Sequence, residues 1–243
     1  MNLSRQPVVE ESKRLGRKYF RQAEVISKGQ PNNYGEAFSL YRSAALLDHP
    51  RACFAVGYIY SWGLSRRTNL RLAAKWYSRG ARLGDPWAAL EYGVLLRLGK
   101  GVKKNRKLAF QQMTYAAEYN IPEAIFRLAD HYAYGEGVRR NLLLAYKLYL
   151  SAARSGLADA QSALGYCYFY GRGTKRNHAL AYKWYLRAAQ QGERDATYNL
   201  GLMFKHGHGV EKSVRHARQF FERASKLGHP NAQYHLKQLR HER

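Results

Sequence analysis

The stretch Asp159–Gly192, DAQSALGYCYFYGRGTKRNHALAYKWYLRAAQQG, predicts two helices joined by a turn. Its first half, Ala160–Tyr168, places apolar residues at helical spacing. A Gly-x-Gly break interrupts this pattern, and Asn177 follows as a typical helix N-cap. A second amphipathic run covers Ala181–Ala189, and the closing glycine is typical of a helix C-terminus. The stretch therefore predicts a unit of two helices and two turns.

This unit recurs along the chain with a period of 36 residues. The period is marked by the alanines Ala52, Ala88, Ala124, Ala160, Ala196 and Ala232. Five positions later stand Gly57, Gly93, Gly165 and Gly201, with Ala129 in the same slot. Bulky pairs recur in the second helix as Trp76-Tyr77, Gln112-Met113, Leu148-Tyr149, Trp184-Tyr185 and Phe220-Phe221. A single helix pair cannot bury its apolar face, so neighbouring pairs must stack. The small slots allow helices to approach, and the bulky slots fill the remaining gap.

The pattern A-x-x-x-L-G-x-x-Y-x-x-G-x-G-V-x-x-[DN]-x-x-x-A-x-x-W-Y-x-x-A-A-x-x-G resembles the Sel1-like repeat family, a relative of the tetratricopeptide repeats. The resemblance covers about residues 12–240. It implies an all-α fold, a right-handed α-solenoid of about six antiparallel helix pairs. It also implies a role in protein–protein interaction and in the assembly of complexes, usually without catalysis.

The period divides the chain into a short tail and one solenoid domain. We expect an N-terminal tail at residues 1–11 and the solenoid at 12–240. Its repeats fall at about 12–48, 49–84, 85–120, 121–156, 157–192 and 193–228, with a C-terminal cap helix at 229–240. The first repeat carries a five-residue insertion in the polar stretch 27–33.

The formal net charge of +24 predicts an acidic partner. Nucleic acid, an anionic membrane surface and an acidic protein all fit this charge. Runs of 18 apolar residues and an apolar secretory leader are both missing, so we expect no membrane span and no export signal. Cys53 and Cys167 stand in different repeats. We therefore expect two small buried side chains and a reducing, cytoplasmic location.

Basic residues recur just before the second helix of successive repeats and predict a basic edge. They are Arg66, Arg67, Lys103, Lys104, Arg139, Arg140, Lys175, Arg176 and Lys212. The helix caps that follow them are Asn69, Asn105, Asn141, Asn177 and Ser213, where the family often has Asp. Two interpretations remain open for this edge. It either binds an anionic partner, or it only adds solubility. In the second case the cations stand where the C-terminus of the preceding helix favours positive charge.

Aromatic residues at variable positions of the first helices predict a binding groove, by analogy with tetratricopeptide repeats. They are Phe54, Tyr58, Trp62, Phe126, Tyr134, Tyr166, Tyr170 and Tyr198. Such rings are good anchors for a peptide, and beside Lys and Arg they also stack on unpaired bases. The alternative is that many of them are half-buried packing residues.

We find no catalytic constellation in the sequence. Glu123, Asp159 and Asp195 start first helices, where negative charge is favoured, and no recurrent pair of carboxylates indicates acid–base chemistry. His206, His208 and His216 are interpreted as surface residues rather than metal ligands, and we expect no cofactor. The sequence therefore predicts a non-catalytic scaffold that binds a protein or peptide partner of acidic character. The alternative is a nucleic-acid-binding repeat protein that uses the basic edge.

Overall fold

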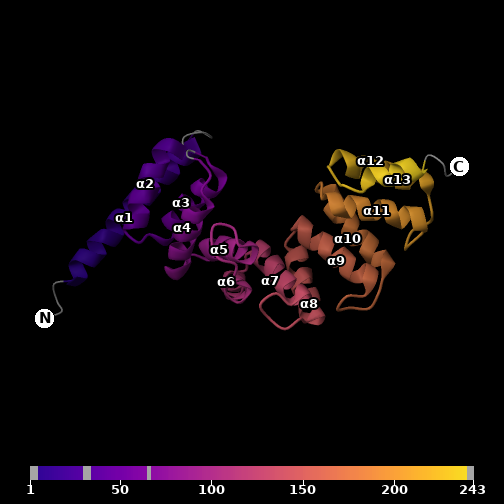
Figure 1. Ribbon diagram of the computed structural model, residues 1–243, viewed down its shortest axis with the longest axis horizontal. Helices are drawn as coiled ribbons and strands as arrows, with labels where there is room; N and C mark the ends of the chain where they lie inside the picture. Colours follow the sequence, from indigo (N-terminus) through magenta and orange to yellow (C-terminus); the bar gives the residue numbers. More distant parts are fainter. Residues whose placement is uncertain (1–4, 30–33, 65–66, 240–243) are drawn as a thin grey trace. The chain divides into compact units, whose positions relative to one another are not determined.

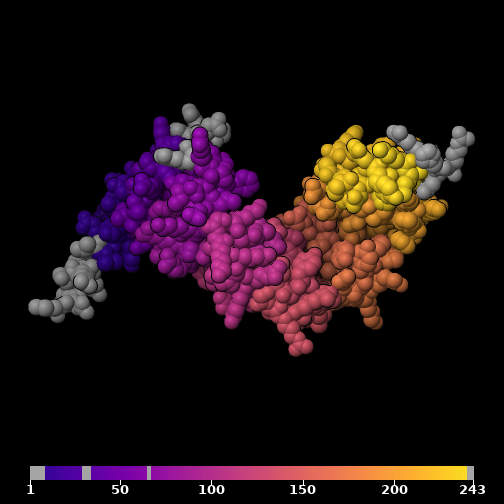
Figure 2. All heavy atoms as spheres, viewed as in Figure 1, coloured from indigo at the N-terminus to yellow at the C-terminus, as the bar shows by residue number. Residues whose placement is uncertain are grey.

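The computed structural model describes residues 5–29, 34–64 and 67–239, and within these ranges it contains thirteen helices and no strand (Figure 1). The predicted all-α fold of paired helices is confirmed. The chain divides into two compact units, residues 1–119 and 120–243. Within each unit, the atoms of successive segments lie against one another on the face seen in Figure 2.

Unit 1 contains three helix pairs. Its helices are α1 (Arg5–Gly29), α2 (Tyr34–Leu46), α3 (Pro50–Trp62), α4 (Leu70–Arg82), α5 (Pro86–Leu98) and α6 (Arg106–Glu118). Each helix packs against the next one in the chain, and α3 also contacts α5. The odd-numbered helices are thus the first helices of the repeats, and the even-numbered helices are the second.

Unit 2 contains three further pairs and a last, shorter helix. Its helices are α7 (Pro122–Tyr134), α8 (Leu142–Arg154), α9 (Ala158–Tyr170), α10 (His178–Gln190), α11 (Arg194–His206), α12 (Val214–Lys226) and α13 (Ala232–Leu239). Consecutive helices pack against one another, and α9 contacts α11. The first helices α7, α9 and α11 contribute one wall of the unit, on which the candidate site lies.

Capping residues set the ends of the second helices as predicted. Asn69, Asn105, Asn141, Asn177 and Ser213 each accept a hydrogen bond from the backbone N–H three residues later. The first helices α3, α5, α7, α9 and α11 end at a glycine in the left-handed conformation, with φ between 67° and 73°. The same two signals therefore shape each of these five connections from a first to a second helix.

In three of the helix pairs, a glycine of the first helix lies against an aromatic ring of the second. A Cβ atom added at Gly165 would lie 2.7 Å from Cδ1 of Tyr185, which is 1% exposed. Gly57 faces Tyr77, and Gly201 faces Phe221, in the same way. The small slot thus lets the ring lie directly on the backbone of the partner helix.

The N-terminal region differs from the prediction. Helix α1 begins at Arg5, so residues 5–11, which we expected in a tail, belong to this helix. It spans 25 residues, whereas helices α2 to α12 span 13 each. Ser27 and Lys28, part of the polar insertion, prolong this helix because they continue its regular hydrogen bonding rather than opening a loop. No helix in the described ranges is long and apolar enough to cross a membrane.

Candidate binding groove

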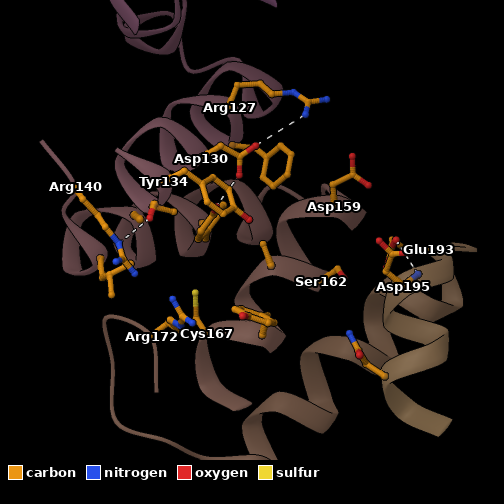
Figure 3. A pocket seen from close by; sticks show the side chains of 18 of the residues that line it. Arg127, Asp130, Tyr134, Arg140, Asp159, Ser162, Cys167, Arg172, Glu193 and Asp195 are labelled. Carbon is orange, nitrogen blue, oxygen red and sulfur yellow. Dashed lines mark hydrogen bonds and ion pairs between the residues drawn. The ribbon is translucent and has the colours of Figure 1, made fainter. Parts of the chain in front are cut away.

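A groove of about 860 Å³ lies in unit 2 along α7, α9 and α11 (Figure 3). Side chains of these first helices line it, and residues of the connections that follow α7 and α9 form one end. Side chains of α8 close it from below, with Tyr149 lying under Phe126. All of the lining residues belong to a single unit.

The eight aromatic residues predicted for a groove occupy three slots of the 36-residue period. The first slot holds Phe54, Phe126 and Tyr198, the second holds Tyr58 and Tyr166, and the third holds Trp62, Tyr134 and Tyr170. These slots are four residues apart, which places them on one face of a first helix. The three slots differ in how far their side chains are exposed to solvent.

Residues of the first slot pack against the second helix of their own repeat. The ring centroids are 5.9 Å apart for Phe54 and Tyr77, and 5.8 Å apart for Phe126 and Tyr149. Tyr198 lies 5.6 Å from Phe221 and stacks on His229 at 3.9 Å. Phe126 is buried, while the other two are half-buried. This slot therefore serves mainly packing, which was the alternative that the sequence left open.

Residues of the second and third slots are exposed. Tyr134 is 73% exposed, Tyr170 57% and Tyr166 42%. Tyr134 and Tyr166 line the groove of unit 2, and Tyr170 contacts Tyr166 with ring centroids 4.5 Å apart. Three aromatic side chains are thus available at the surface of this groove.

Unit 1 carries a smaller version of the same face. Tyr58 lies between Phe54 and Trp62 along α3, with centroid distances of 5.9 and 6.0 Å. Phe54 and Tyr58 line a hollow of about 200 Å³ together with Arg51. The Arg51 guanidinium lies over the Phe54 ring at 4.4 Å, so this hollow is already partly filled.

Charged residues that the sequence analysis had not assigned to a groove also line it. Arg172 lies near the end of α9, and Asp159, Glu193 and Asp195 lie at the starts of α9 and α11. Asp159 and Asp195 were interpreted only as helix-start residues, and Glu193 was not singled out. Arg172 carries no repeating signal, because the residue between the two loop glycines differs from repeat to repeat. Their shared surface becomes visible only when the first helices are placed side by side.

Asp130 anchors the floor of the groove. It accepts a hydrogen bond of 2.7 Å from the Tyr149 hydroxyl, and Arg127 Nη1 lies 4.0 Å from its other oxygen. Burial, together with the charge of Asp130, raises the pKa of Tyr149 far above its ordinary value. Tyr149 therefore stays protonated and serves as a donor that holds this carboxylate in place.

The predicted basic edge lies on the connections between first and second helices, and its described members are exposed. Arg66 lies outside the described residues. The Cβ atoms of four edge residues lie close to the left-handed glycine of their connection: Lys104 at Gly99, Arg140 at Gly135, Arg176 at Gly171 and Lys212 at Gly207. Arg140 differs in also lining the groove, where its Nε donates to the Ala133 carbonyl at 3.1 Å. The edge and the groove therefore meet at Arg140.

Neighbouring connections in unit 2 are fixed on the preceding repeat. A side chain at Gly173 would overlap the Leu142 carbonyl at the start of α8. Gly209 makes the corresponding approach to His178 at the start of α10. The basic residues 139–140, 175–176 and 212 thus follow one another along the same side of this unit.

The two cysteines are buried, and His208 packs against other rings. Cys53 and Cys167 are buried and free, and burial raises their pKa to about 11 and about 12. His208 packs near Phe169, with centroids 5.6 Å apart, and near His206 at 5.7 Å. Across the described ranges, no group of three or more His, Cys, Asp and Glu side chains has the arrangement of a metal site.

The stability of unit 2 is expected to fall on mild acidification. Burial lowers the pKa of His229 and of His235, so the unfolded chain binds protons at these sites more readily than the folded chain. Their contribution to stability is complete above the unfolded pKa of about 6.5 and is lost as the pH falls through the lower folded values. We expect the thermal midpoint to drop between pH 7.5 and 5.5.

Calorimetry of a His229→Gln/His235→Gln variant checks this expectation. Its midpoint should depend less on pH over that range than the midpoint of the unchanged protein. The control is a change of the exposed His216 to Gln, which should keep the full dependence. An equal dependence in the double variant would assign the effect to other groups.

The geometry defines a helical-repeat protein built from stacked antiparallel helix pairs. The family model of the Sel1 repeat matches residues 26–49, 50–85, 88–118, 122–157, 158–193 and 194–229. The chain therefore belongs to the Sel1 repeat family, and the resemblance seen in the sequence is confirmed. Sel1 repeats generally form scaffolds for protein–protein interaction and are typically non-catalytic.

Solved structures show the same fold. The chain is similar to a Sel1 repeat protein from Oxalobacter formigenes, with a TM-score of 0.82 and 25% identity over 90% of this chain and 86% of that one. It is also similar to c5321, a protective antigen of uropathogenic Escherichia coli strains with an SLR fold. Here the TM-score is 0.78 and the identity 27%, over 97% of this chain and 51% of that one, so the chain spans about half of that protein. No curated protein sequence gives a significant match.

Proposed function

We propose that this protein is a non-catalytic scaffold that binds an extended segment of a partner protein in the groove of unit 2. The observation that carries the proposal is the groove itself, about 860 Å³ in volume and lined by exposed tyrosines. Exposed aromatic side chains around a concavity are common anchors for a bound chain. The net charge of +24 favours a partner that is acidic overall. The two buried thiols fit a cytoplasmic setting, which we include in the proposal.

Affinity capture from a cell extract, with and without nuclease, tests the class of partner. We expect a protein partner to remain bound after nuclease treatment, and to be lost from a variant with Tyr134 and Tyr166 changed to alanine. A control with Tyr234→Ala should keep the partner, because this tyrosine is 61% exposed but lies on α13, away from the groove. Loss of all captured protein on nuclease treatment would contradict the proposal.

Nucleic-acid binding along the basic edge is the second candidate function. The observation in its favour is the series of exposed basic residues on successive connections of unit 2. A phosphate backbone that follows these residues would release counterions. Because Arg140 also belongs to the groove, the test uses only edge residues outside it.

Salt dependence of binding to a 20-base-pair DNA duplex separates specific from general charge effects. The edge variant carries Gln at Arg139, Lys175, Arg176 and Lys212, and the control carries Gln at Lys147, Lys183, Arg215 and Lys226. Both lose four positive charges from exposed positions. For a protein-binding scaffold we expect equal slopes of log affinity against log salt in the two variants. A slope shallower by about 3–4 in the edge variant alone would favour the nucleic-acid function, since each phosphate contact contributes about −0.9.

A further inference from the structure

The groove of unit 2 has opposite charges at its two ends. Arg140 and Arg172 lie at the end formed by the connections, whereas Asp159, Glu193 and Asp195 lie at the starts of α9 and α11 (Figure 3). Tyr134 and Tyr166 line the groove between them. The surface thus changes from positive through aromatic to negative along the direction of the first helices.

The charge at the positive end is available to a ligand. Arg140 Nε donates to a neutral backbone carbonyl, and the Arg172 guanidinium lies 5.9 Å from the centre of the Tyr166 ring. Contacts with a neutral carbonyl and a neutral ring position the guanidinium groups without neutralising them. Two guanidinium groups that converge on one end of a groove favour a carboxylate, which accepts paired hydrogen bonds from such groups.

The negative end has more carboxylates than the helix starts require. Glu193 caps α11 by accepting from the backbone N–H groups of Asp195 and Ala196. Asp195 lies two residues further and contacts Arg194 at 3.3 Å and the His229 ring at 3.7 Å, while Asp159 is exposed in the first turn of α9. Arg127 also lines the groove, but it is paired with Glu123 at 2.7 Å and lies 4.0 Å from Asp130. The three remaining carboxylates outnumber Arg194, so this end is negative.

The repeat register shows that these acids are a property of unit 2. Asp159 and Asp195 share their slot with Arg51 and Trp87 in unit 1. Helices α3 and α5 form with those residues, so helix formation alone does not demand an acid at this slot. In the same slot, Glu123 is paired with Arg127 at 2.7 Å. Asp159 and Asp195 therefore place acids beside the large groove at a slot that does not require them for helix formation.

We propose that this groove binds an extended peptide segment with an acidic end at Arg140 and Arg172 and a basic end at Asp159 and Asp195. The proposal rests on the proposed scaffold function and names the chemistry of its partner. Thirteen residues of α9 and its connection separate Asp159 from Arg172, about 20 Å at 1.5 Å per residue. An extended peptide covers this distance with about six residues. A uniformly acidic segment would place carboxylates against Asp159 and Asp195 and is disfavoured.

Selection from a displayed library of random eight-residue peptides against the full chain tests this inference. Enriched peptides should carry an acidic and a basic residue separated by about four to six positions. Affinities of the synthetic peptides are then measured by fluorescence anisotropy. An Asp159→Lys/Asp195→Lys variant should bind the same peptides about tenfold more weakly or worse, because like charges then face each other. Selection against that variant should yield peptides that are acidic at both ends.

A matched control changes Glu211 and Glu222 to Lys, which shifts the net charge equally at exposed positions outside the groove. It should leave the affinities within about twofold of the unchanged protein. Enrichment of uniformly acidic peptides, or equal affinities for the Asp159/Asp195 variant and the control, would overturn the inference.

The Tyr166→Ala change distinguishes failure of the charge requirement from failure of the proposed scaffold function. Peptides that lose affinity in Tyr166→Ala but tolerate the charge reversal would leave the scaffold function standing and remove only the charge requirement. Peptides that tolerate both changes, or a selection that enriches none over a Tyr134→Ala/Tyr166→Ala variant, would contradict groove binding altogether.

Discussion

Replacing Tyr185 with alanine is expected to lower the free energy of unfolding by about 3–5 kcal/mol, the range found for large aromatic residues in cores. Tyr185 is 1% exposed, and its ring lies against the backbone of α9 at Gly165. Removing the ring leaves a cavity between α9 and α10 that neither helix fills without moving. Urea unfolding followed by far-UV circular dichroism measures this loss.

The control for this prediction is Tyr170→Ala, the same chemical change at a tyrosine that is 57% exposed. It should cost less than about 1 kcal/mol, because little apolar surface returns to water. Equal losses at both positions would show that the ring of Tyr185 has no special role in holding the pair together.

The glycine on the other side of this contact provides a second test. Gly165→Leu forces a side chain into the space of the Tyr185 ring and should cost about 1–3 kcal/mol or more. In the double variant Gly165→Leu/Tyr185→Ala the new side chain occupies part of the vacated space. We therefore expect the double variant to lose clearly less stability than the two single losses combined. Strict additivity would mean that the two positions do not share one space.

The largest expected effect on binding comes from the exposed tyrosines of the groove. Loss of an anchor side chain commonly costs about 2 kcal/mol or more, which corresponds to about a 30-fold weaker partner affinity. We expect this effect for Tyr166→Ala, and a larger one when Tyr134 and Tyr170 are changed as well. The partner recovered by affinity capture serves as the probe, with Kd measured by calorimetry.

The folded state should survive these changes, because all three rings are at least 42% exposed. Circular dichroism and the urea midpoint verify this for each variant, and Tyr234→Ala is the control for a general loss of surface tyrosine. A partner affinity that falls only together with the urea midpoint would assign these rings to the fold rather than to binding.

The sequence predicts the repeat architecture because one period repeats the same local physics. The caps Asn141 and Asn177, the left-handed glycines and the contact between Gly165 and Tyr185 each follow from residue type and spacing, and the structure confirms them. Each of these features lies within one repeat or at its border. A single repeat was therefore sufficient to identify them.

The groove was harder to predict because its residues come from several repeats. Phe126 was predicted to belong to a groove, with packing as the alternative, and it lines the groove while buried against Tyr149. This contact depends on how the first helix rotates over the second. Arg172 was not singled out, and Asp159 was interpreted only as a helix-start residue, because a role in the groove depends on which residues lie opposite. The period does indicate which of the aromatic residues pack. Phe54, Phe126 and Tyr198 occupy the same position of the repeat, and all three pack on the second helix.

The two kinds of connection in unit 2 differ in how much added sequence they tolerate. Gly173 and Gly209 lie directly against the preceding repeat, so an extra residue there would lift the connection away from its support. The opposite turns, at Gly156 and Gly192, have open space where a side chain would begin. A tag, a fluorescent label or a whole inserted domain should therefore be accepted beside Gly156 or Gly192. Such an insertion would add to one side of the repeats and leave the side that carries the basic edge unchanged.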